Sequence, residues 1–374
     1  MIIAVNTKAL LSGHTEGNAV FIYEVFTRIT AQHPDHEFIF IADRPFDERL
    51  IKGKNVKGMV VGPVARHPLF LKYWNDIKVP SALTKYKADV LVSCDGICSL
   101  RTKIPQCLVV QDLGFLEHPS FIKRSHVRYY KKNIPKSLGK AVAVATVSEF
   151  LKNGIIGQYK TAAGKIDVIY NGVNEVFQPS GPEEKANTKN KYTEGREYFV
   201  FTGGIDPGKN LMNLLKAFSV FKKRQKTNMK LVLAGKLAEN YGSFAESLRS
   251  YKYREDVVMT GDVEESELVK ITAAAYGMVY PSLLDGFAVP VVEAMKCNVP
   301  VITAADSSGQ EIAKDAALYS DANDIGSIAD KMMLLYKDEN LRNELITKGF
   351  AVAREYSWGR TADLLWQSIL KAVN

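Results

Sequence analysis

The sequence is poor in cysteine and histidine and has no long apolar segment. Its 374 residues include 4 cysteines and 6 histidines, with no spacing typical of a zinc site or a disulfide framework. We expect the cysteines to be reduced, mostly buried thiols. No run approaches the ~18 apolar residues that a membrane span needs, and residues 2–5 form a strand-like start in place of a signal peptide. A cytoplasmic location is therefore expected, with peripheral contact at the inner face of the membrane left open.

The composition is that of a basic globular protein. Hydrophobic residues make up 46% of the chain, the net charge is +8 and the isoelectric point is near 9.0. The length favours two or three domains of roughly 100 to 200 residues each. The positive charge favours nucleic acid, anionic lipid or phosphorylated small molecules as partners, without deciding among them.

Short apolar strands alternate with amphipathic helices in two series, which predicts an α/β protein with two doubly wound parallel sheets. Ligands of such sheets bind at the carboxyl ends of the strands, so we expect those ends to face each other across a central cleft. Polar residues without periodicity at 179–196 predict a linker between an N-terminal domain, 1–178, and a C-terminal domain, 197–356. Strands are expected at 2–5, 37–41, 89–92, 107–111, 141–146 and 167–170, then at 198–202, 230–234, 257–259, 275–280 and 299–303. Helices are expected at 18–31, 211–221, 265–274, from 289, and at 341–374 with a break near 356–358.

Residues 203–210, Gly-Gly-Ile-Asp-Pro-Gly-Lys-Asn, follow one strand and open the next helix. They nearly match the phosphate-binding loop of nucleoside triphosphatases, but Asn210 stands where a hydroxyl should bind magnesium. Pro207 also lacks an N–H, so a triphosphatase is disfavoured. Two interpretations remain. Lys209 binds a diphosphate while Asn210 caps the helix, or the segment is a tight turn with a surface lysine.

An acid lies on either side of a helix start in residues 281–302. Asp285 precedes a helix that begins near Val289 with Pro290 in its first turn, and Glu293 lies inside that helix. The pair could serve as general acid and base, or could be one loop acid and one helix acid. Free backbone N–H groups at the helix start form a seat for an anion, beside which a carboxylate can accept sugar hydroxyls.

Residues 281–295, Pro-Ser-Leu-Leu-Asp-Gly-Phe-Ala-Val-Pro-Val-Val-Glu-Ala-Met, resemble the hallmark of the GT4 family of retaining glycosyltransferases, two glutamates separated by seven residues. Residues 168–173, 146–150 and 356–358 resemble further segments of that family, and nearly the whole chain fits it. The resemblance implies the GT-B fold of two Rossmann-like domains, with a last helix, 357–374, that packs back on the first domain.

The resemblance also implies roles for individual residues. Asp285 would lie near the hydroxyls of the donor sugar, Glu293 would bind the donor ribose, and Lys209 would neutralise the departing diphosphate. From the N-terminal domain, Gly17 would let the backbone approach the diphosphate, and Asp112 would face the sugar or the acceptor. The remaining donor-binding candidates are Gly204, Asn210, Gly235, Lys236, Val263 near the nucleobase, Gly286, Phe287, Ala288 and Val289.

Several residues depart from the family pattern. Asp285 is one methylene shorter than the usual glutamate, and Gly204 stands where many members have a diphosphate-binding arginine. Lys236 is a second cation that could compensate. Gln111 replaces a common histidine before Asp112. These departures motivate an alternative, a catalytically weakened nucleotide-sugar-binding or partner subunit on the same scaffold.

The family resemblance predicts a metal-independent enzyme that moves a hexose, mannose- or glucose-like, from a nucleoside-diphosphate sugar to a glycan or lipid-linked glycan in cell-surface polysaccharide synthesis. No cofactor is expected beyond the donor.

Residues 122–140 are strongly basic and contain no acid. Such a helix could lie on anionic lipid or receive a phosphorylated acceptor, or it could be an ordinary solvated face. No nucleic-acid-binding motif accompanies it, so nucleic acid is not the expected partner. Its basic residues are Lys123, Arg124, Arg128, Lys131, Lys132, Lys136 and Lys140, interleaved with Tyr129 and Tyr130.

Overall fold

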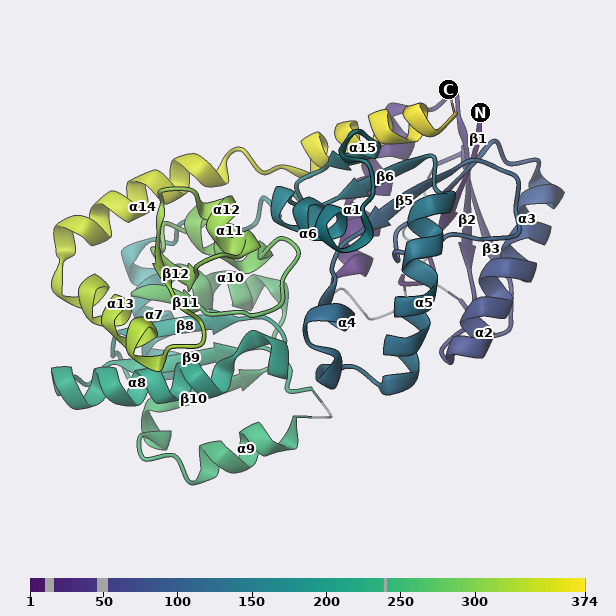
Figure 1. The fold of residues 1–374 in the computed structure, drawn as a ribbon. Coiled ribbons are helices and arrows are strands. Elements are labelled where there is room, and N and C mark those ends of the chain that lie inside the picture. Colours follow the sequence, from purple (N-terminus) through teal and green to yellow (C-terminus); the bar gives the residue numbers. More distant parts are fainter. Residues whose placement is uncertain (11–16, 46–52, 239–240, 374) are drawn as a thin grey trace. The chain divides into compact units, whose positions relative to one another are not determined.

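The computed structural model describes residues 1–10, 17–45, 53–238 and 241–373. The chain divides into two compact units (Figure 1). The first contains Met1–Gly172 and Ser357–Asn374, and the second contains Val173–Tyr356. Each unit is built on a parallel sheet flanked by helices, which confirms the predicted fold class of two parallel-sheet α/β domains.

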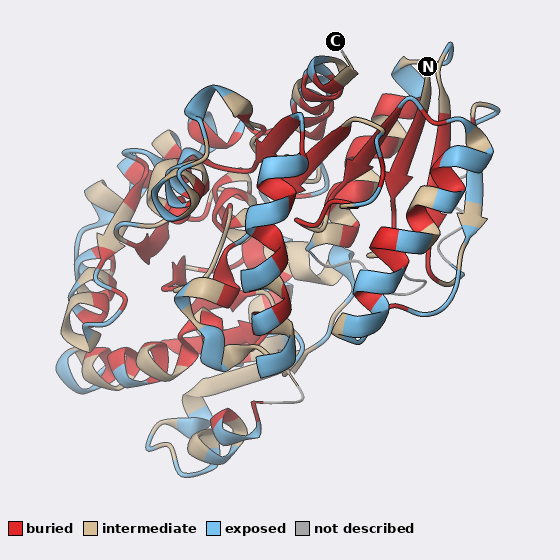
Figure 2. Cartoon of the chain, turned by 45° about the vertical axis from the view of Figure 1, so that its right-hand side comes forward, coloured by how far each residue is buried: buried red, intermediate tan, exposed pale blue. Residues whose placement is uncertain are grey.

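The sheet of the first unit has the order β3-β2-β1-β4-β5-β6-β7 within the described residues, and each neighbouring pair is parallel. Its central strands are buried along nearly their whole length, as expected for a sheet covered on both faces (Figure 2). The order reverses between β1 and β4, which is the topological switch point. The strands are β1 (Ile2–Asn6), β2 (Glu37–Ala42), β3 (Val56–Val60), β4 (Val90–Ser93), β5 (Gln106–Val110), β6 (Ala143–Thr146) and β7 (Ile166–Val168).

The last helix of the chain belongs to the first unit. Trp358 meets Phe21 edge to face, with ring centroids 6.3 Å apart, and Trp366 stacks on His33 at 3.8 Å. A side chain at Gly172 would meet the Trp358 backbone N at 2.1 Å, so the chain passes this point at very close range. The helices of this unit are α1 (Asn18–Gln32), α2 (Pro68–Tyr73), a π-helical turn (Trp74–Lys78), α3 (Val79–Tyr86), α4 (Gly114–Glu117), α5 (Arg124–Lys140), α6 (Glu149–Tyr159) and α15 (Trp358–Val373).

The sheet of the second unit has the order β10-β9-β8-β11-β12-β13 in the described part of the chain, again fully parallel. Its switch point lies between β8 and β11. The strands are β8 (Tyr198–Thr202), β9 (Lys230–Ala234), β10 (Val257–Gly261), β11 (Gly277–Tyr280), β12 (Val301–Ala304) and β13 (Ala317–Ser320). The helices are α7 (Pro182–Thr193), α8 (Leu211–Gln225), α9 (Gly242–Arg249), α10 (Glu265–Ala273), α11 (Val289–Lys296), α12 (Ser308–Ala313), α13 (Ile325–Lys337) and α14 (Glu339–Ala353).

A helix occupies the segment that was expected to be a linker. α7 lies within 179–196, and the second unit already begins at Val173, so that expectation is corrected. Pro182 in the first turn and the acids Glu183 and Glu184 beside it favour the helix start. The helix is polar around most of its circumference, which explains why it shows no apolar periodicity.

Two strands were not expected from the sequence. β3 is an edge strand whose residues are largely exposed, and β13 is a four-residue edge strand, so neither has a long apolar run. The break expected near 356–358 separates α14 from α15, and Asn374 lies outside the described residues. Every helix in the described ranges is too short or too polar to cross a membrane.

Candidate active site

Two loops of the second unit follow neighbouring strands at its switch point. Residues 203–210 follow β8 and residues 281–288 follow β11, so both loops lie at the carboxyl edge of the sheet. In the first loop, Asp206 accepts a hydrogen bond from Gly208 N at 2.8 Å and starts a short 3-10 turn that ends at Lys209. Leu283 N donates to Gly208 O at 2.9 Å, which joins the two loops.

Lys209 and Asp285 form an ion pair between these loops. Lys209 Nζ lies 2.7 Å from Asp285 Oδ1 and 3.2 Å from the Tyr280 hydroxyl, which donates to Asp285 Oδ2 at 2.9 Å. Lys209 Nζ also lies 3.4 Å from Leu284 O. The side chains of Lys209 and Asp285 are only 17% and 20% exposed, so water screens the pair weakly. We call Lys209, Asp285 and Tyr280 the charge cluster.

The electrostatics of the charge cluster favour a cationic lysine beside a neutral phenol. Burial opposes the charge on Lys209, but Asp285 and Tyr280 outweigh it, so the pKa of Lys209 is raised. Burial and the Asp285 carboxylate also raise the pKa of Tyr280. The family resemblance implies that Lys209 binds the diphosphate and that Asp285 binds the sugar. In the structure, the charges of Lys209 and Asp285 neutralise each other.

Tyr280 is the member of the cluster that sequence reasoning missed. It is the last residue of β11, almost fully buried, and stacked on Phe201 with ring centroids 5.5 Å apart. A buried tyrosine needs a partner for its hydroxyl, and Asp285 supplies it. The sequence signal that could have identified Tyr280 is its position, because it ends an apolar strand five residues before the acid Asp285.

The start of α11 lies directly after Asp285. Ala288 precedes the helix in the left-handed conformation, with φ 57°, and no side chain caps the helix. Phe287 is buried and meets Tyr356 edge to face, which anchors the loop. Ser308 Oγ donates to Asp285 O at 2.7 Å. The connection Gly286–Val289 is thus held in place at a helix N-terminus, where the backbone favours negative charge.

Glu293 lies in the middle of α11 and is half-buried. Within the described residues its carboxylate has no hydrogen bond or ion pair. Burial, reinforced by the nearby Glu265, raises the pKa of Glu293 to about 8. A carboxyl group with a pKa so far above the ordinary range marks a candidate binding position.

Asn210 differs from its expected role. It precedes α8 in the left-handed conformation, with φ 61°, but its side chain makes no capping hydrogen bond. Its amide donates to Pro281 O at 3.1 Å and to Ala322 O at 2.6 Å. The predicted cap is therefore wrong, because the Asn210 amide instead donates hydrogen bonds to buried carbonyls of neighbouring loops, which need a partner.

Glycines keep the loops after β8, β9 and β10 close together. Gly235 has φ 154°, and a Cβ there would meet Gly203 O at 1.9 Å. At Gly204 the nearest atom to an added Cβ is Asp206 Oδ2 at 3.6 Å, an ordinary contact. Lys236 is exposed, and Val263 is half-buried after Gly261, whose φ is 70°.

Two of the predicted residues, Gly17 and Asp112, belong to the first unit. Gly17 is exposed, has φ 55° and directly precedes α1, with open space where a side chain would lie. Asp112 is exposed after β5 and accepts a hydrogen bond from Gly114 N at 3.0 Å. The side-chain nitrogen of the neighbouring Gln111 is buried without a hydrogen-bond partner.

The first unit also contains a polar cluster that was not predicted from the sequence. Lys8 Nζ lies 2.9 Å from Asp95 Oδ2, and Asn6 Nδ2 donates to the same oxygen at 3.1 Å. Asn6 ends β1, Lys8 follows it and Asp95 follows β4, so the group lies at the switch point of that sheet. The sequence does not predict this cluster, because single polar residues near strand ends indicate a site only when the order of the strands is known.

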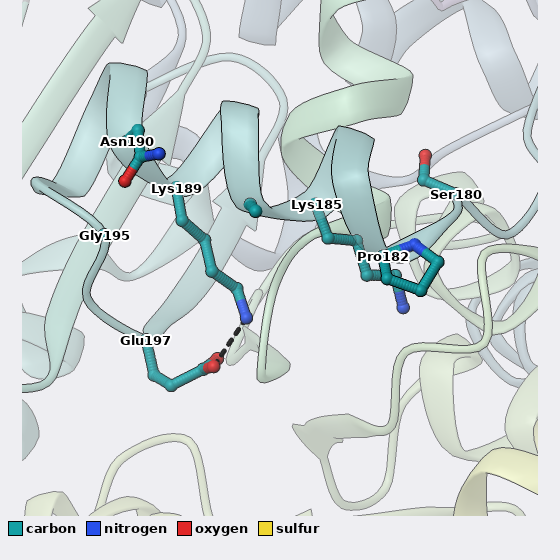
Figure 3. A pocket seen from close by; sticks show the side chains of 8 residues that line it. Ser180, Pro182, Lys185, Lys189, Asn190, Gly195 and Glu197 are labelled. Atoms are coloured by element: carbon teal, nitrogen blue, oxygen red, sulfur yellow. Dashed lines mark hydrogen bonds and ion pairs between the residues drawn. The ribbon is translucent and has the colours of Figure 1, made fainter.

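A cavity of about 440 Å³ lies elsewhere in the second unit, between α7 and the segment before β8 (Figure 3). Lys185 and Lys189 line it, and Lys189 pairs with Glu197 at 2.5 Å. Glu197 directly precedes β8, so this cavity is at the amino edge of the sheet, opposite the predicted site. In the described part of the chain, no three His, Cys, Asp or Glu side chains are grouped to hold a metal ion.

Comparison with known proteins places the chain in a family. The model of the glycosyl transferases group 1 matches residues 182–352, and the model of glycosyltransferase family 4 matches residues 17–177. O-antigen chain mannosyltransferase B of Escherichia coli is 28% identical over 66% of this chain and 65% of its own length. O-antigen chain mannosyltransferase RfbU of Salmonella typhimurium is 29% identical over 67% of this chain and 65% of its own length.

The match thus spans slightly less than two thirds of the length of these relatives. The crystal structure of WaaG, a glycosyltransferase involved in lipopolysaccharide biosynthesis, superposes with a TM-score of 0.78 over 99% of both chains at 13% identity. That likeness shows the same fold, GT-B. With both family models matched in order along most of the sequence, the chain belongs to glycosyltransferase family 4, the group 1 glycosyltransferases.

Proposed function

We propose that this protein is a retaining glycosyltransferase that moves a mannose- or glucose-like hexose from a nucleoside-diphosphate sugar to a glycan or lipid-linked glycan acceptor. The relatives named as O-antigen chain mannosyltransferases support a role in cell-surface polysaccharide synthesis. The observation that carries the proposal is the charge cluster, since it holds a cation at the switch point of the second sheet beside the start of α11.

The leaving diphosphate would become the ion-pair partner of Lys209. Its phosphate oxygens would replace the Asp285 carboxylate as the partner of Lys209 Nζ, and the N-terminus of α11 would supply further positive potential. Asp285, released from Lys209 but still held by Tyr280, would accept hydrogen bonds from donor sugar hydroxyls. Glu293 would accept hydrogen bonds from the ribose. We assign no metal ion to this site.

The transfer step conserves the configuration at the sugar. The bond from the anomeric carbon to the diphosphate oxygen breaks, and a bond to the acceptor oxygen forms on the same face. The proton of the acceptor hydroxyl passes to the departing diphosphate, so no side chain has to act as a nucleophile. The protein contributes position and preorganised charge.

Product analysis tests this proposal. The purified chain is incubated with a panel of nucleoside-diphosphate hexoses and glycan acceptors, and the product linkage is identified by nuclear magnetic resonance. We expect one donor to be used, with an anomeric configuration in the product equal to that of the donor. A product of inverted configuration would contradict the retaining mechanism.

A second candidate is a nucleotide-sugar-binding subunit without efficient catalysis. It is favoured by Gly204, which brings no cation to the first loop, and by Asp285, whose two side-chain oxygens are both occupied. Calorimetry with the same donor panel, followed by assays for donor hydrolysis and transfer, separates the two candidates. Tight binding without hydrolysis or transfer would support the second.

A further inference from the structure

The first unit has an exposed apolar stripe on the segment from α2 to α3. Leu69 is 73% exposed, Phe70 50%, Tyr73 42% and Ile77 39%. Leu69, Tyr73 and Ile77 recur every four residues and Phe70 precedes Tyr73 by three, which places all four along one side of this continuous helical segment. Of the eleven large apolar side chains that are exposed in the described parts of the chain, six lie between residues 60 and 77. Such clustering marks an interaction site rather than scattered surface residues.

The basic helix α5 packs directly beside this stripe. Asn75 Nδ2 donates to the Tyr129 hydroxyl at 3.5 Å, and His126 Nε2 lies 2.9 Å from Arg66 O. Tyr129, which alternates with basic residues in the sequence, is buried, and Tyr130 beside it is half-buried. The two tyrosines therefore lie on the inner face of α5. The exposed apolar side chains of this surface belong to the segment from α2 to α3. Figure 2 marks exposed residues along both.

The outer face of α5 carries uncompensated positive charge. The six predicted basic residues of α5 and Lys123 just before it are all exposed, and none forms an ion pair with a carboxylate within the described residues. Elsewhere on the surface many lysines and arginines are paired, as Lys348 is with Asp315 and Glu344. An unpaired basic face beside an apolar stripe is the combination with which peripheral proteins bind anionic membranes.

We propose that the apolar stripe and the basic face of α5 together dock on an anionic lipid bilayer. We call them the docking surface. Leu69, Phe70 and Ile77 would enter the boundary between headgroups and acyl chains, while the cations of α5 would contact lipid phosphates. A second copy of this chain is a poorer occupant, because a two-fold interface would bring two identical basic faces together. The proposal is independent of the proposed function, since membrane binding requires neither donor nor transfer.

Vesicle sedimentation of the full chain tests the proposal. The two lipid samples are vesicles of phosphatidylcholine alone and of an equimolar mixture of phosphatidylcholine and phosphatidylglycerol. We expect binding to the mixed vesicles only, weakening as salt is added. Each cation at a membrane surface strengthens partitioning about fivefold, so Arg128→Gln/Lys131→Gln/Lys132→Gln should weaken it by roughly a hundredfold.

The apolar stripe has its own variant. Leu69→Gln/Phe70→Gln/Ile77→Gln keeps helix-forming residues at exposed positions, and we expect a loss of about tenfold for each side chain that no longer enters the bilayer. Matched controls are Leu334→Gln and Phe350→Gln, which are exposed apolar residues of the second unit, and Lys216→Gln on α8. These controls should bind vesicles like the parent protein. Circular dichroism and the melting temperature establish that every variant is folded.

Three results would overturn the proposal. The parent protein could fail to bind the mixed vesicles, it could bind both lipid samples equally, or the variants of the docking surface could bind like the controls. Size-exclusion chromatography with light scattering is run on the same samples. A parent dimer that the stripe variant converts to monomer would mean that a second copy covers the stripe.

Discussion

Neutralising one charged member of the charge cluster should cost nearly as much stability as neutralising both. With Lys209 Nζ and Asp285 Oδ1 2.7 Å apart, their attraction is about 6 kcal/mol at an effective dielectric constant of about 20. Burial of the two charges offsets most of this attraction. We expect Lys209→Met and Asp285→Asn each to lower the free energy of unfolding by about 2–3 kcal/mol, and the double variant to lower it by a similar amount.

The tryptophans make the assay specific for one unit. All three, Trp74, Trp358 and Trp366, belong to the first unit, whereas the charge cluster belongs to the second. Urea unfolding is therefore followed by two probes. Far-ultraviolet circular dichroism reports on both units, and tryptophan fluorescence reports on the first unit alone and serves as the reference. If the effects of the two single variants simply added in the double variant, Lys209 and Asp285 would have no coupling energy and the expected stabilising pair would not exist.

Three further predictions concern the second unit. Glu293 keeps a proton in the folded protein up to pH about 8, and an ordinary glutamate releases it near 4.5, so stability falls as pH rises between these values. Glu293→Gln should therefore raise the melting temperature above that of the parent at pH above about 8 but not near pH 4.5. An equal gain for the exposed control Glu246→Gln would contradict this prediction. Gly235→Ala should lower the free energy of unfolding by about 3 kcal/mol because its Cβ would clash with Gly203 O, while Gly204→Ala should change it by less than about 0.5 kcal/mol. Gly204→Arg should strengthen binding of nucleoside diphosphates about tenfold in calorimetry by adding a second phosphate-binding cation, and unchanged affinity would show that the position does not face the phosphates.

The sequence predicted the parts of the fold that depend on local pattern. Nearly every buried strand lies within a few residues of its expected position, because a strand covered on both faces is a short continuous apolar run. β3 and β13 were missed because they are edge strands, and α7 because it is a polar surface helix. The family resemblance supplied the prediction of the site, since the spacing of Asp285 and Glu293 can be read in the sequence itself.

The pairing inside the site could not be predicted. Lys209 and Asp285 are separated by 76 residues, and they meet because β8 and β11 are neighbours across the switch point. Tyr280 belongs to the cluster because it is the last residue of a buried strand and its hydroxyl must find a partner. Asn210 was misassigned for a related reason, because the carbonyls it satisfies, Pro281 O and Ala322 O, belong to loops distant in sequence.

The docking surface illustrates the same limit. The basic residues of α5 are evident in the sequence, but the sequence does not show which side of the helix is buried. Leu69, Phe70 and Ile77 resemble core residues in an apolar pattern, and only their exposure reveals a stripe. The two features became one surface because α2 and α5 pack against each other.

A calorimetric titration tests whether Lys209 binds the diphosphate of the donor. Calorimetry compares a nucleoside diphosphate with the matching nucleoside, for the parent, for Lys209→Met and for Lys216→Met, an exposed lysine of α8 that serves as control. Uridine, guanosine and adenosine pairs are used because the nucleobase is not assigned.

We expect Lys209→Met to lose affinity for the diphosphate alone in this titration. Lys209→Met should weaken binding of the diphosphate by about tenfold to a hundredfold, as expected for a charge-assisted contact, and should leave the weaker binding of the nucleoside unchanged. Lys216→Met should match the parent for both ligands. If Lys209→Met bound the diphosphate as tightly as the parent while remaining folded, Lys209 would not be the residue that binds the diphosphate.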